Sequence, residues 1–405
     1  MTVEALQDLR VLEFGAFAAG PAVGKHLADH GAEVIHVESR LRMDGFRTNY
    51  PPYKENQPGP ERAAMFAITH NNKLGVTLNL KSEGGRDLAR RLAARADVVI
   101  ENFTPGTMER LGLSHQELAR SNPRLVTLST CNQGQSGPHA QNPGFGTHLT
   151  GLAGFLHLTG WPDRDPALLW GPYIDYIAVA YGVVAVLAAL EQRRQTGRGC
   201  HLDLAQYEAG LQFLAPVLLD FFASGRVAGR DGNRHPLAAP HGVYPCAGEE
   251  RWCAISVHDD QEWRRLRTAL GEPEWARAPH LATAAARKAA EEEIDRHLGR
   301  WTRGLSREEV VSRLRQAEVH VAPVNDMADI HADPQLQVME VWRPVEHPVL
   351  GSYLAVGPPF LLSETPAVLD RGAPLLGEHN RQVFQGWLGL SEDEYRRLEA
   401  ESAFE

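Results

Sequence analysis

An aspartate at the start of a long apolar helix is the first residue of this chain that suggests chemistry. Asp175 lies in the segment 170–176, directly before the almost wholly apolar run 177–190. Pro172 is suited to the first turn of a helix, and an acid there lies near the positive end of the helix dipole. The ordinary interpretation is a first-turn acid that stabilises its own helix. Because the helix is apolar all round, however, we expect it to be buried, and a carboxylate at the edge of a core needs a partner or a chemical role.

The turn between the first expected strand and the first helix is a second candidate. Segment 15–20 begins and ends with glycine. A turn of this kind can hold a phosphate at the helix N-terminus, which makes Ala16, Phe17 and Ala18 candidate cofactor contacts. The alternative is a tight turn that needs small residues. The segment is neither GxGxxG nor a P-loop, although Glu38 could mimic the ribose-binding acid of a dinucleotide fold. We therefore expect no nicotinamide cofactor.

Basic residues follow several of the expected strands. A scattered surface arginine is commonplace, but this placement suits a ligand with several phosphates. The residues are Arg40, Arg42, Arg47, Lys73, Lys81 and Arg110. The net charge of the chain is −10, which argues against nucleic acid or an anionic membrane as a partner. An anionic ligand must therefore use a local basic patch.

Composition indicates an ordinary soluble, cytoplasmic protein. The length of 405 residues favours two or more domains, and the cysteines show no zinc spacing and are typical of reduced thiols. No signal peptide precedes Leu9, and the longest apolar run is shorter than the roughly 20 residues that span a bilayer. His70, His148 and His241 belong to no metal-binding motif. We therefore expect neither a membrane segment nor a metal.

Strand and helix signals alternate in the first half of the chain. Helices are predicted at about 20–30 and 82–96, and strands at residues 10–14, 34–37, 76–80, 98–100, 125–129 and 201–204. This alternation is typical of the α/β class, with a mostly parallel, doubly wound sheet that binds ligands at the carboxyl ends of its strands. The polar, proline-rich segment 40–60 is a long excursion, and such loops are usually functional.

The pattern changes after residue 225. Segments 242–246 and 252–257 predict a β-hairpin, and charged helices are expected at about 260–270, 284–300 and after a capping box that joins Ser306 to Glu309. We therefore expect a large domain from 1–225, a smaller α+β domain from 226–330, and a C-terminal segment, 331–405, that returns to the large domain. The last helix of that segment should be capped by Ser391 with Glu394.

Short motifs are spread through the chain from residue 19 to residue 379. They are Ala19-Gly20-Pro21, 31–35, Asn72-Lys73 with 78–81, 97–103 with Pro105-Gly106, 110–112, 122–124, 134–138, Asp175 before its helix, 196–199 and 377–379. Each motif alone is weak. Their joint order resembles the class III CoA-transferases, the family of formyl-CoA transferase and carnitine CoA-transferase, which shares a superfamily with α-methylacyl-CoA racemase.

The resemblance implies an interlocked homodimer, in which each chain has a Rossmann-like large domain built from N- and C-terminal parts and a small domain between them. It implies that Asp175 is the catalytic nucleophile and that coenzyme A lies over the strand ends as a substrate and product thioester. By motif position the contacts of coenzyme A are Leu78, Leu80, Lys81, Asn102, Phe103 and Arg110. Ser39 stands where the family usually has an arginine, so Arg40 or Arg42 must substitute for it.

Some positions depart from the family's patterns. Formyl-type members carry a glutamine at the position of Ala18, a glutamate at that of Gly146 and a glycine-rich flap at 237–242, so oxalate or formate chemistry is not expected. The racemases have a His-Asp pair where this chain has Phe145 and Gly146. The chain therefore lacks the second proton-transfer base, which argues against racemisation.

We expect an enzyme that moves coenzyme A from an acyl-CoA to a free carboxylic acid through an aspartyl anhydride and an aspartyl-CoA thioester. Backbone N–H groups of 15–19 or 237–242 are candidates for stabilising the oxyanion. Burial should raise the pKa of Asp175, and the helix N-terminus should lower it. The alternatives are an acyl-CoA racemase or isomerase, CoA migration within a dicarboxylic acid, a nicotinamide dehydrogenase, and a non-catalytic acyl-CoA-binding protein.

Overall fold

The structure, a computed structural model, describes residues 3–405 as two compact units. The larger unit contains the chain up to Leu158, Ala167–Ala228 and Val338–Glu405, and the smaller unit contains Thr159–Pro166 and Gly229–Gln337. The domain boundaries drawn from the sequence stay a prediction. No local sequence pattern indicated that residues 159–166 lie with the smaller unit.

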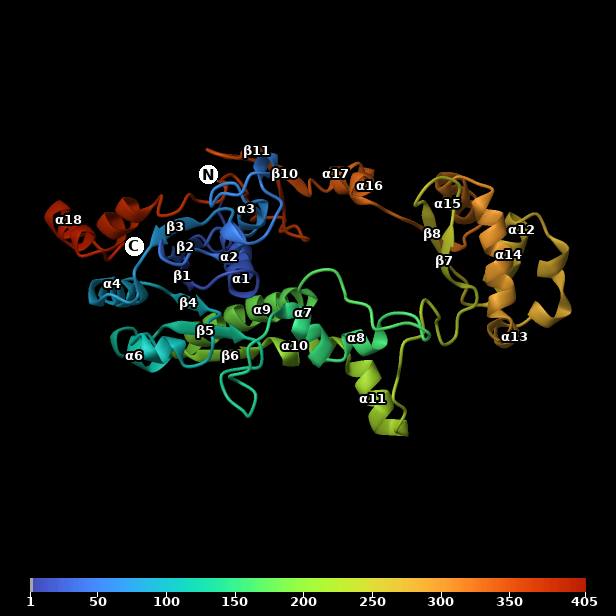
Figure 1. Ribbon diagram of the computed structural model, residues 1–405, viewed down its shortest axis with the longest axis horizontal. Helices are drawn as coiled ribbons and strands as arrows, with labels where there is room; N and C mark the ends of the chain where they lie inside the picture. Colours follow the sequence, from blue (N-terminus) through green and yellow to red (C-terminus); the bar gives the residue numbers. More distant parts are fainter. Residues whose placement is uncertain (1–2) are drawn as a thin grey trace. The chain divides into compact units, whose positions relative to one another are not determined.

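A six-stranded parallel sheet forms the centre of the larger unit (Figure 1). The strands, in the order β3-β2-β1-β4-β5-β6, are β1 Arg10–Phe14, β2 Glu33–Glu38, β3 Leu74–Thr77, β4 Val98–Glu101, β5 Val126–Cys131 and β6 His201–Ala205. The strand order reverses between β1 and β4, so the carboxyl ends of these two strands flank the crevice where doubly wound sheets bind ligands. The expected α/β class with a parallel sheet is confirmed.

Both faces of this sheet are buried. One face packs against helix α4 (Glu83–Ala93) and the C-terminal segment, and the other packs against α1 (Ala19–Ala28) and α9 (Tyr173–Thr196). Successive side chains of a strand point to opposite faces, so Leu12 enters the first core and Val11 the second. Strands buried on both faces have nearly continuous apolar sequences, which is why they could be found from the sequence.

The remaining elements of the larger unit are short. They are α2 (Gly45–Thr48), a 3₁₀ helix at Lys54–Asn56, α3 (Ala64–Thr69), α5 (Thr107–Arg110), α6 (His115–Ser121), α7 (Gly146–Leu152), α8 (Phe155–Leu158), α10 (Gln206–Phe213), α11 (Ala215–Ser224), α18 (Glu392–Ala400), a π-helix at Gln382–Trp387, and the antiparallel pair β10 (Trp342–His347) and β11 (Gly351–Val356). Ser391 caps α18 by accepting a hydrogen bond from the Glu394 N–H, as predicted.

Three antiparallel strands form the sheet of the smaller unit. In the order β7-β8-β9 they are β7 His241–Pro245, β8 Trp252–Ser256 and β9 His320–Val324. The α-helices between residues 260 and 338 are α12 (Asp260–Ala269), α13 (Ala284–Ala289), α14 (Glu291–Arg303), α15 (Arg307–Gln316), α16 (Met327–His331) and α17 (Pro334–Val338), and two 3₁₀ helices lie at Glu274–Arg277 and Pro279–Leu281. The predicted hairpin and the capping box of Ser306 with Glu309 are both present. The helix expected at 284–300 is instead two helices that meet at Ala290.

The third strand of the larger sheet differs from the prediction. The sequence predicts a strand at 76–80, but β3 ends at Thr77. The chain then leaves the sheet, because the Asn79 N–H donates a hydrogen bond to the carbonyl of Ala403 in the C-terminal segment. Leu78 therefore lies just beyond the carboxyl end of the strand.

Helix α9 is not buried all round, contrary to expectation. Ile174, Val179 and Val186 are buried, whereas Val184 is 65% and Leu187 is 41% exposed. By length and composition alone α9 is apolar enough to cross a membrane, but the core helix of a soluble protein passes the same test. One side of α9 packs against α1 and the sheet, which favours the core-helix interpretation.

Candidate active site

Asp175 is held in the first turn of α9 by the packing of its neighbours. The Asp175 N–H donates to the carbonyl of Pro172 at 3.0 Å, directly before the helix. Ile174 is wholly buried and packs with Leu149 and Phe155. This packing draws the start of the helix inward, so that Asp175 is only 9% exposed.

Burial dominates the electrostatics of this carboxyl group. Desolvation raises the pKa of Asp175 to about 7, and within residues 3–405 neither a cation nor a hydrogen bond offsets it. Of the two effects expected from the sequence, burial is the one that shifts this pKa. A first-turn acid that served only to stabilise its helix would have no reason to bear the cost of desolvation. This environment therefore favours the chemical role over the ordinary interpretation.

Gly146 lies directly against the Asp175 carboxylate. A Cβ added at Gly146 would be 2.1 Å from Asp175 Oδ2 and 2.5 Å from the Cβ of Pro172. Gly146 is the first residue of α7, and only glycine at this position leaves room for the carboxylate. The glutamate that formyl-type enzymes carry at the position of Gly146 therefore has no place in this arrangement.

The turn between β1 and α1 forms hydrogen bonds with the side chains of neighbouring segments. The Ala16 N–H donates to Asn102 Oδ1 at 3.0 Å, and Asn102 Nδ2 donates to the Ala16 carbonyl at 2.7 Å. The Phe17 N–H donates to both oxygens of Asp44, at 3.1 and 3.2 Å. These two N–H groups were among the expected oxyanion donors, but both already have partners. Ala18 is buried and supplies no side-chain cap to α1.

Aromatic rings connect this turn to the surroundings of Asp175. The ring of Phe17 packs edge-on against Phe46 at 5.6 Å, Tyr50 at 5.9 Å and Phe145 at 5.9 Å between ring centroids. Phe145 directly precedes Gly146, which contacts the carboxylate. The polar excursion from residue 40 to residue 60 therefore contributes two rings to the neighbourhood of the candidate nucleophile.

The residues expected to contact coenzyme A differ in accessibility. Leu78 is wholly buried in the core, and Leu80 and Phe103 are partly buried against the same core. Lys81 and Arg110 are exposed, and Arg110 donates to Thr107 Oγ1 at 2.8 Å. Leu78 and Asn102 therefore offer a ligand little beyond their backbone, whereas the two cations are free to reach it.

Arg40 and Arg42 are both exposed, but they have different surroundings. Arg40 donates to the carbonyl of Leu376 at 3.3 Å and lines a cavity of about 390 Å³ together with Arg381 and Tyr395. Arg42 is not among the residues that line this cavity. Of the two candidates, Arg40 is the one placed beside a hollow.

Two of the basic residues singled out in the sequence cannot bind a phosphate. Lys73 is wholly buried, and its ammonium group lies 2.9 and 3.0 Å from the two oxygens of Glu13. Arg47 is also wholly buried and donates from Nε and Nη2 to the carboxylate of Glu38. Both cations neutralise acids of the neighbouring strands β1 and β2, so their expected role as ligand contacts is wrong.

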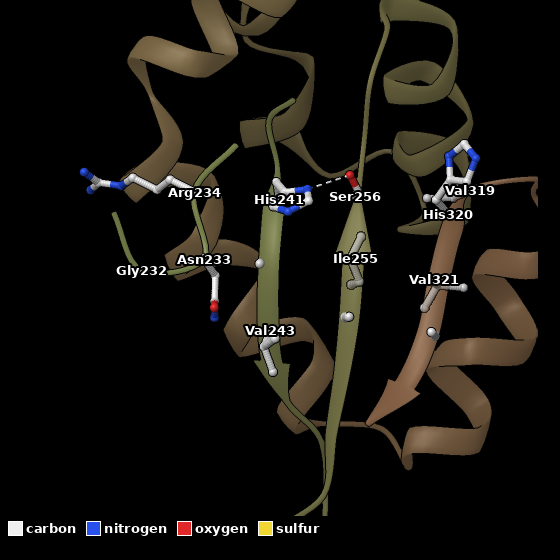
Figure 2. Close-up of a pocket in the computed structure, with 13 residues that line it drawn as sticks. Gly232, Asn233, Arg234, His241, Val243, Ile255, Ser256, Val319, His320 and Val321 are labelled. Atoms are coloured by element: carbon white, nitrogen blue, oxygen red, sulfur yellow. Dashed lines mark hydrogen bonds between the residues drawn. The ribbon is translucent and has the colours of Figure 1, made fainter. Parts of the chain in front are cut away.

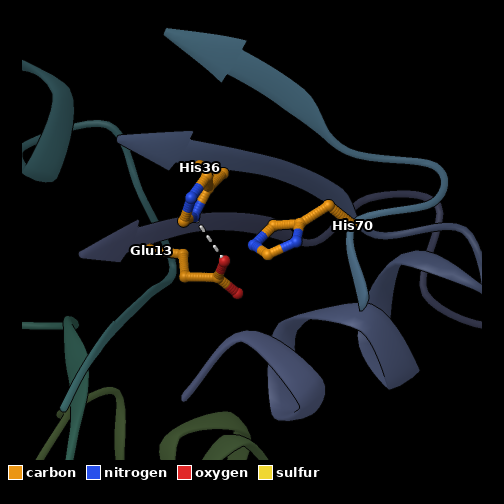
Figure 3. Close-up of side chains that lie close together, drawn as sticks. All are labelled: Glu13, His36 and His70. Carbon is orange, nitrogen blue, oxygen red and sulfur yellow. Dashed lines mark hydrogen bonds and ion pairs between the residues drawn. The ribbon is translucent and has the colours of Figure 1, made fainter. Parts of the chain in front are cut away.

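A buried cluster of Glu13, His36 and His70 has the residue types of a metal site (Figure 3). His36 Nδ1 lies 2.7 Å from Glu13 Oε1, while Lys73 contacts both oxygens of the same carboxylate. The ammonium group already supplies the positive charge that a metal would bring. We therefore interpret the cluster as a buried ion network. Spacing alone gave no signal for it, because its members come from three separate segments.

The smaller unit has a cavity of its own, of about 780 Å³, on the open face of its sheet. Figure 2 shows His241, Ser256 and His320 at one end of the three strands, with Val243, Ile255 and Val321 further along. His241 Nδ1 lies 2.8 Å from Ser256 Oγ. Of the expected site segments, only 237–242 reaches this cavity, so it gives no support to the residues predicted to contact coenzyme A.

Comparison with known proteins adds to this geometry. The sequence model of CoA-transferase family III matches residues 6–380. The chain is 34% identical to succinyl-CoA–D-citramalate CoA-transferase of Chloroflexus aurantiacus over 396 residues, which cover 98% of this chain and 97% of that protein. It is 33% identical to succinate–glutarate CoA-transferase of Agrobacterium fabrum over 379 residues, 93% of this chain and 94% of that protein. A crystal structure of a CAIB/BAIF family protein from Brucella suis has a TM-score of 0.87 and 32% identity, and covers 95% of this chain and all of that one.

Proposed function

Because the chain belongs to CoA-transferase family III, we propose that it moves coenzyme A from an acyl-CoA to a free carboxylic acid, with Asp175 as the covalent nucleophile. The observation that carries this proposal is a buried carboxyl group with a pKa raised to about 7. Nowhere in the described part of the chain does a cation offset its charge, and it lies against a glycine that leaves it room to react. Its desolvated carboxylate is more reactive than one held by solvent.

The reaction begins with attack by an Asp175 oxygen on the carbonyl carbon of the donor thioester. The carbon–sulfur bond breaks, which gives a mixed anhydride and CoA thiolate. The thiolate then attacks Cγ of Asp175, the anhydride C–O bond breaks, and the donor acid leaves from an aspartyl-CoA thioester. The acceptor carboxylate attacks the same carbon and expels the thiolate, which finally takes the acceptor acyl group and releases Asp175. Each step exchanges one acyl bond, so no proton is gained or lost.

Two physical effects make an otherwise poor nucleophile sufficient. Oriented groups in one site react with effective molarities of about 10⁵ M or more, so the thiolate is recaptured as long as coenzyme A stays bound. We assign oxyanion stabilisation to backbone N–H groups at the start of α1, which has no side-chain cap. The N–H groups of Ala16 and Phe17 are excluded from this role by their existing partners.

Exposed cations would bind the phosphates of coenzyme A. We assign this role to Lys81, Arg110 and Arg40, since Arg40 lines a cavity and the other two side chains are exposed. Local cations are needed because the chain itself carries a net charge of −10. The reaction needs neither a metal nor a nicotinamide.

The names of the relatives suggest which acids to test. Two of them are CoA-transferases named for succinyl-CoA with D-citramalate and for succinate with glutarate. We propose that the acceptor of this chain is likewise a short dicarboxylic acid. Oxalate is the least favoured member, because Gly146 replaces the glutamate of the formyl-type enzymes.

We further propose that the enzyme acts as an interlocked homodimer in the cytoplasm, without a nucleic-acid or membrane partner. The support is the exposed apolar surface of the larger unit, where Leu219 and Phe222 of α11 are 64% and 74% exposed, in addition to Val184 of α9. Single chains rarely leave large apolar patches in water. A second copy of the chain would cover such residues.

The proposal is tested with purified protein, succinyl-CoA and a panel of free acids, with acyl-CoA products identified by mass spectrometry. Wild type should form a new acyl-CoA that depends on the acceptor, and hydroxylamine should trap a modified Asp175. Asp175→Asn keeps the size of the side chain but should abolish transfer, whereas Asp87→Asn, an exposed aspartate on α4, should retain it. Wild-type turnover in freshly purified Asp175→Asn protein, with deamidation excluded by mass, would disprove the nucleophile assignment.

A further inference from the structure

Phe17 has a backbone conformation that its own side chain disfavours. Its φ angle is +64°, in the left-handed region that is costly for a residue with a bulky side chain. Such a conformation persists only where neighbouring groups hold it. Strained positions of this kind cluster at functional sites, so the groups that hold Phe17 are of interest.

Asp44 holds the backbone of Phe17 with both carboxylate oxygens. The Phe17 N–H lies 3.1 Å from Asp44 Oδ1 and 3.2 Å from Oδ2. Oδ1 also accepts the N–H of Phe46 at 2.7 Å. Asp44 is buried, so these hydrogen bonds form away from competing water and are strengthened by the charge of the acceptor. We call this arrangement the Asp44 clamp.

Other buried residues hold Asp44 itself in place. The Asp44 N–H donates to Glu38 Oε1 at 3.1 Å, and Glu38 is held by the buried Arg47, whose guanidinium lies 3.4 Å from the centroid of the Phe66 ring. The nearest ring nitrogen of His70 is 3.8 Å from Asp44 Oδ2, beyond hydrogen-bond distance. The carboxylate is therefore oriented by its chain of partners towards the Phe17 N–H.

The position of the Phe17 ring is transmitted to the candidate nucleophile. A Cβ added at Gly45 would lie 2.1 Å from the ring, so the ring rests directly on the backbone of Gly45. On its other side the ring packs against Phe145, and the next residue, Gly146, contacts Asp175 Oδ2. A rotation of Phe17 to an ordinary φ would remove the support of Phe145.

We propose that Asp44 is a positioning residue for the transfer reaction, which holds Phe17 in the left-handed conformation and thereby fixes Phe145 and Gly146 against Asp175. The inference rests on the proposed function of Asp175. It adds a residue that touches neither the substrate nor the reacting carboxylate. The clamp itself is a property of the fold and can be measured separately.

Asp44→Asn is a sharp test, because it preserves shape and removes the paired acceptors. In one amide orientation the NH₂ group faces the Phe17 N–H from the position of Oδ2, and in the other it faces the N–H groups of both Phe17 and Phe46. Either orientation sets donor against donor. Asp44→Ser is the second variant. It removes a desolvated carboxylate, so the free-energy cost of burying that charge on folding is lost. The single serine oxygen cannot replace the two oxygens that accept the Phe17 N–H.

The control is Asp259→Asn in the smaller unit. Asp259 caps α12 by accepting the backbone N–H of Glu262. Asparagine is an equally good N-cap residue, so this variant should keep wild-type stability and activity. The comparison separates the loss of the clamp from the general effect of an Asp-to-Asn change at a backbone contact.

Two measurements are made on each variant. Hydrogen–deuterium exchange of the peptide that contains Phe17 should be at least about tenfold faster in both Asp44 variants, because the Phe17 N–H has lost one or both of its two carboxylate acceptors. With succinyl-CoA and the best acceptor acid, kcat should fall about 10- to 100-fold, while KM for the acyl-CoA stays within about twofold.

The outcomes separate the clamp from the reaction. Unchanged exchange at Phe17 would refute the clamp, and faster exchange with wild-type kcat would refute the positioning role. If both Asp44 variants fail to fold while Asp259→Asn folds, Asp44 is a folding residue and the proposal is overturned. If wild type transfers coenzyme A to no acid, the proposed function fails, whereas the exchange measurement still decides whether the clamp exists.

Discussion

Replacing Gly146 by alanine should disable Asp175 without disturbing coenzyme A. The added Cβ would lie 2.1 Å from Asp175 Oδ2, 2.8 Å from its Cγ and 2.5 Å from the Cβ of Pro172. Non-bonded carbon atoms pack at about 3.5–4.0 Å. Both partners must therefore move away from the new Cβ by about 1 Å or more.

The carboxylate of Asp175 moves more easily of the two, and any shift of Pro172 moves the start of α9 together with Asp175. Pro172 has a fixed ring, and its carbonyl accepts the Asp175 N–H at the start of α9, whereas among the described residues none forms a hydrogen bond or ion pair with the side chain of Asp175. A reacting group displaced by about 1 Å can lose about 100-fold in rate. We therefore expect kcat to fall about 100-fold with KM for the acyl-CoA nearly unchanged, because Lys81 and Arg110 are not touched.

The assay is steady-state transfer from succinyl-CoA, followed by chromatography of the acyl-CoA product. Gly151→Ala in the same helix is the matched control, since its added Cβ would meet only Leu156 Cδ1, at 3.4 Å. Alanine also favours a helix over glycine by about 1 kcal/mol, so this control should be active and no less stable. If Gly146→Ala keeps the kcat of wild type, the carboxylate does not react from the position seen here.

The pH dependence, the cofactor contacts and the alternative reaction give three further predictions. The pKa of Asp175 is raised to about 7, so kcat should rise with pH through about 7. Because the folded state holds this proton more tightly than the unfolded state, the free energy of unfolding falls as the pH rises from about 4 to about 7. The melting temperature of Asp175→Asn should therefore exceed that of wild type by a large margin at pH 8 and by none near pH 4. Arg110→Ala should weaken CoA binding by about 1–3 kcal/mol in calorimetry, while Arg120→Ala, an exposed cation of α6, should not, and equal affinities would remove Arg110 from the site. In D₂O, a 2-methylacyl-CoA should gain no α-deuterium beyond the uncatalysed rate, since Phe145 and Gly146 carry no base; rapid deuteration without CoA transfer would favour the racemase.

The strands of the sheet can be predicted from the sequence because a buried strand is marked by its own apolar residues. The inner strands β1, β2, β4 and β5 are covered on both faces and appear in the sequence as short, mostly apolar runs between turns. The edge strand β6 alternates exposed with partly buried residues. The end of β3 escaped prediction because the Asn79 N–H bonds to Ala403, and no local pattern announces a partner from the C-terminal segment. The site residue Asp175 came from a motif and its place before a helix, and its raised pKa required the packing of Ile174.

Arg47 and Lys73 show what a sequence pattern cannot separate. Both lie in the segments between expected strands, as Lys81 and Arg110 do, yet the first two are wholly buried and the others are exposed. The difference is the presence of an acid on another strand of the sheet, such as Glu13 of β1 beside Lys73. That pairing exists only once the order β3-β2-β1 is formed, so strand order rather than residue type decides which cations remain for a ligand.

The exposed side of α9 connects the proposed homodimer with the chemistry of Asp175. A helix that is apolar all round has no side suited to water, yet Tyr181 and Val184 are exposed in the single chain. The sequence therefore specifies more burial than one chain provides, and the missing cover would lie on the helix that begins with the nucleophile. Because desolvation alone raises the pKa of Asp175, a second copy that excludes water from the start of α9 would preserve or increase that shift. Dimer formation would then complete the burial of the Asp175 carboxylate, which the single chain provides only in part.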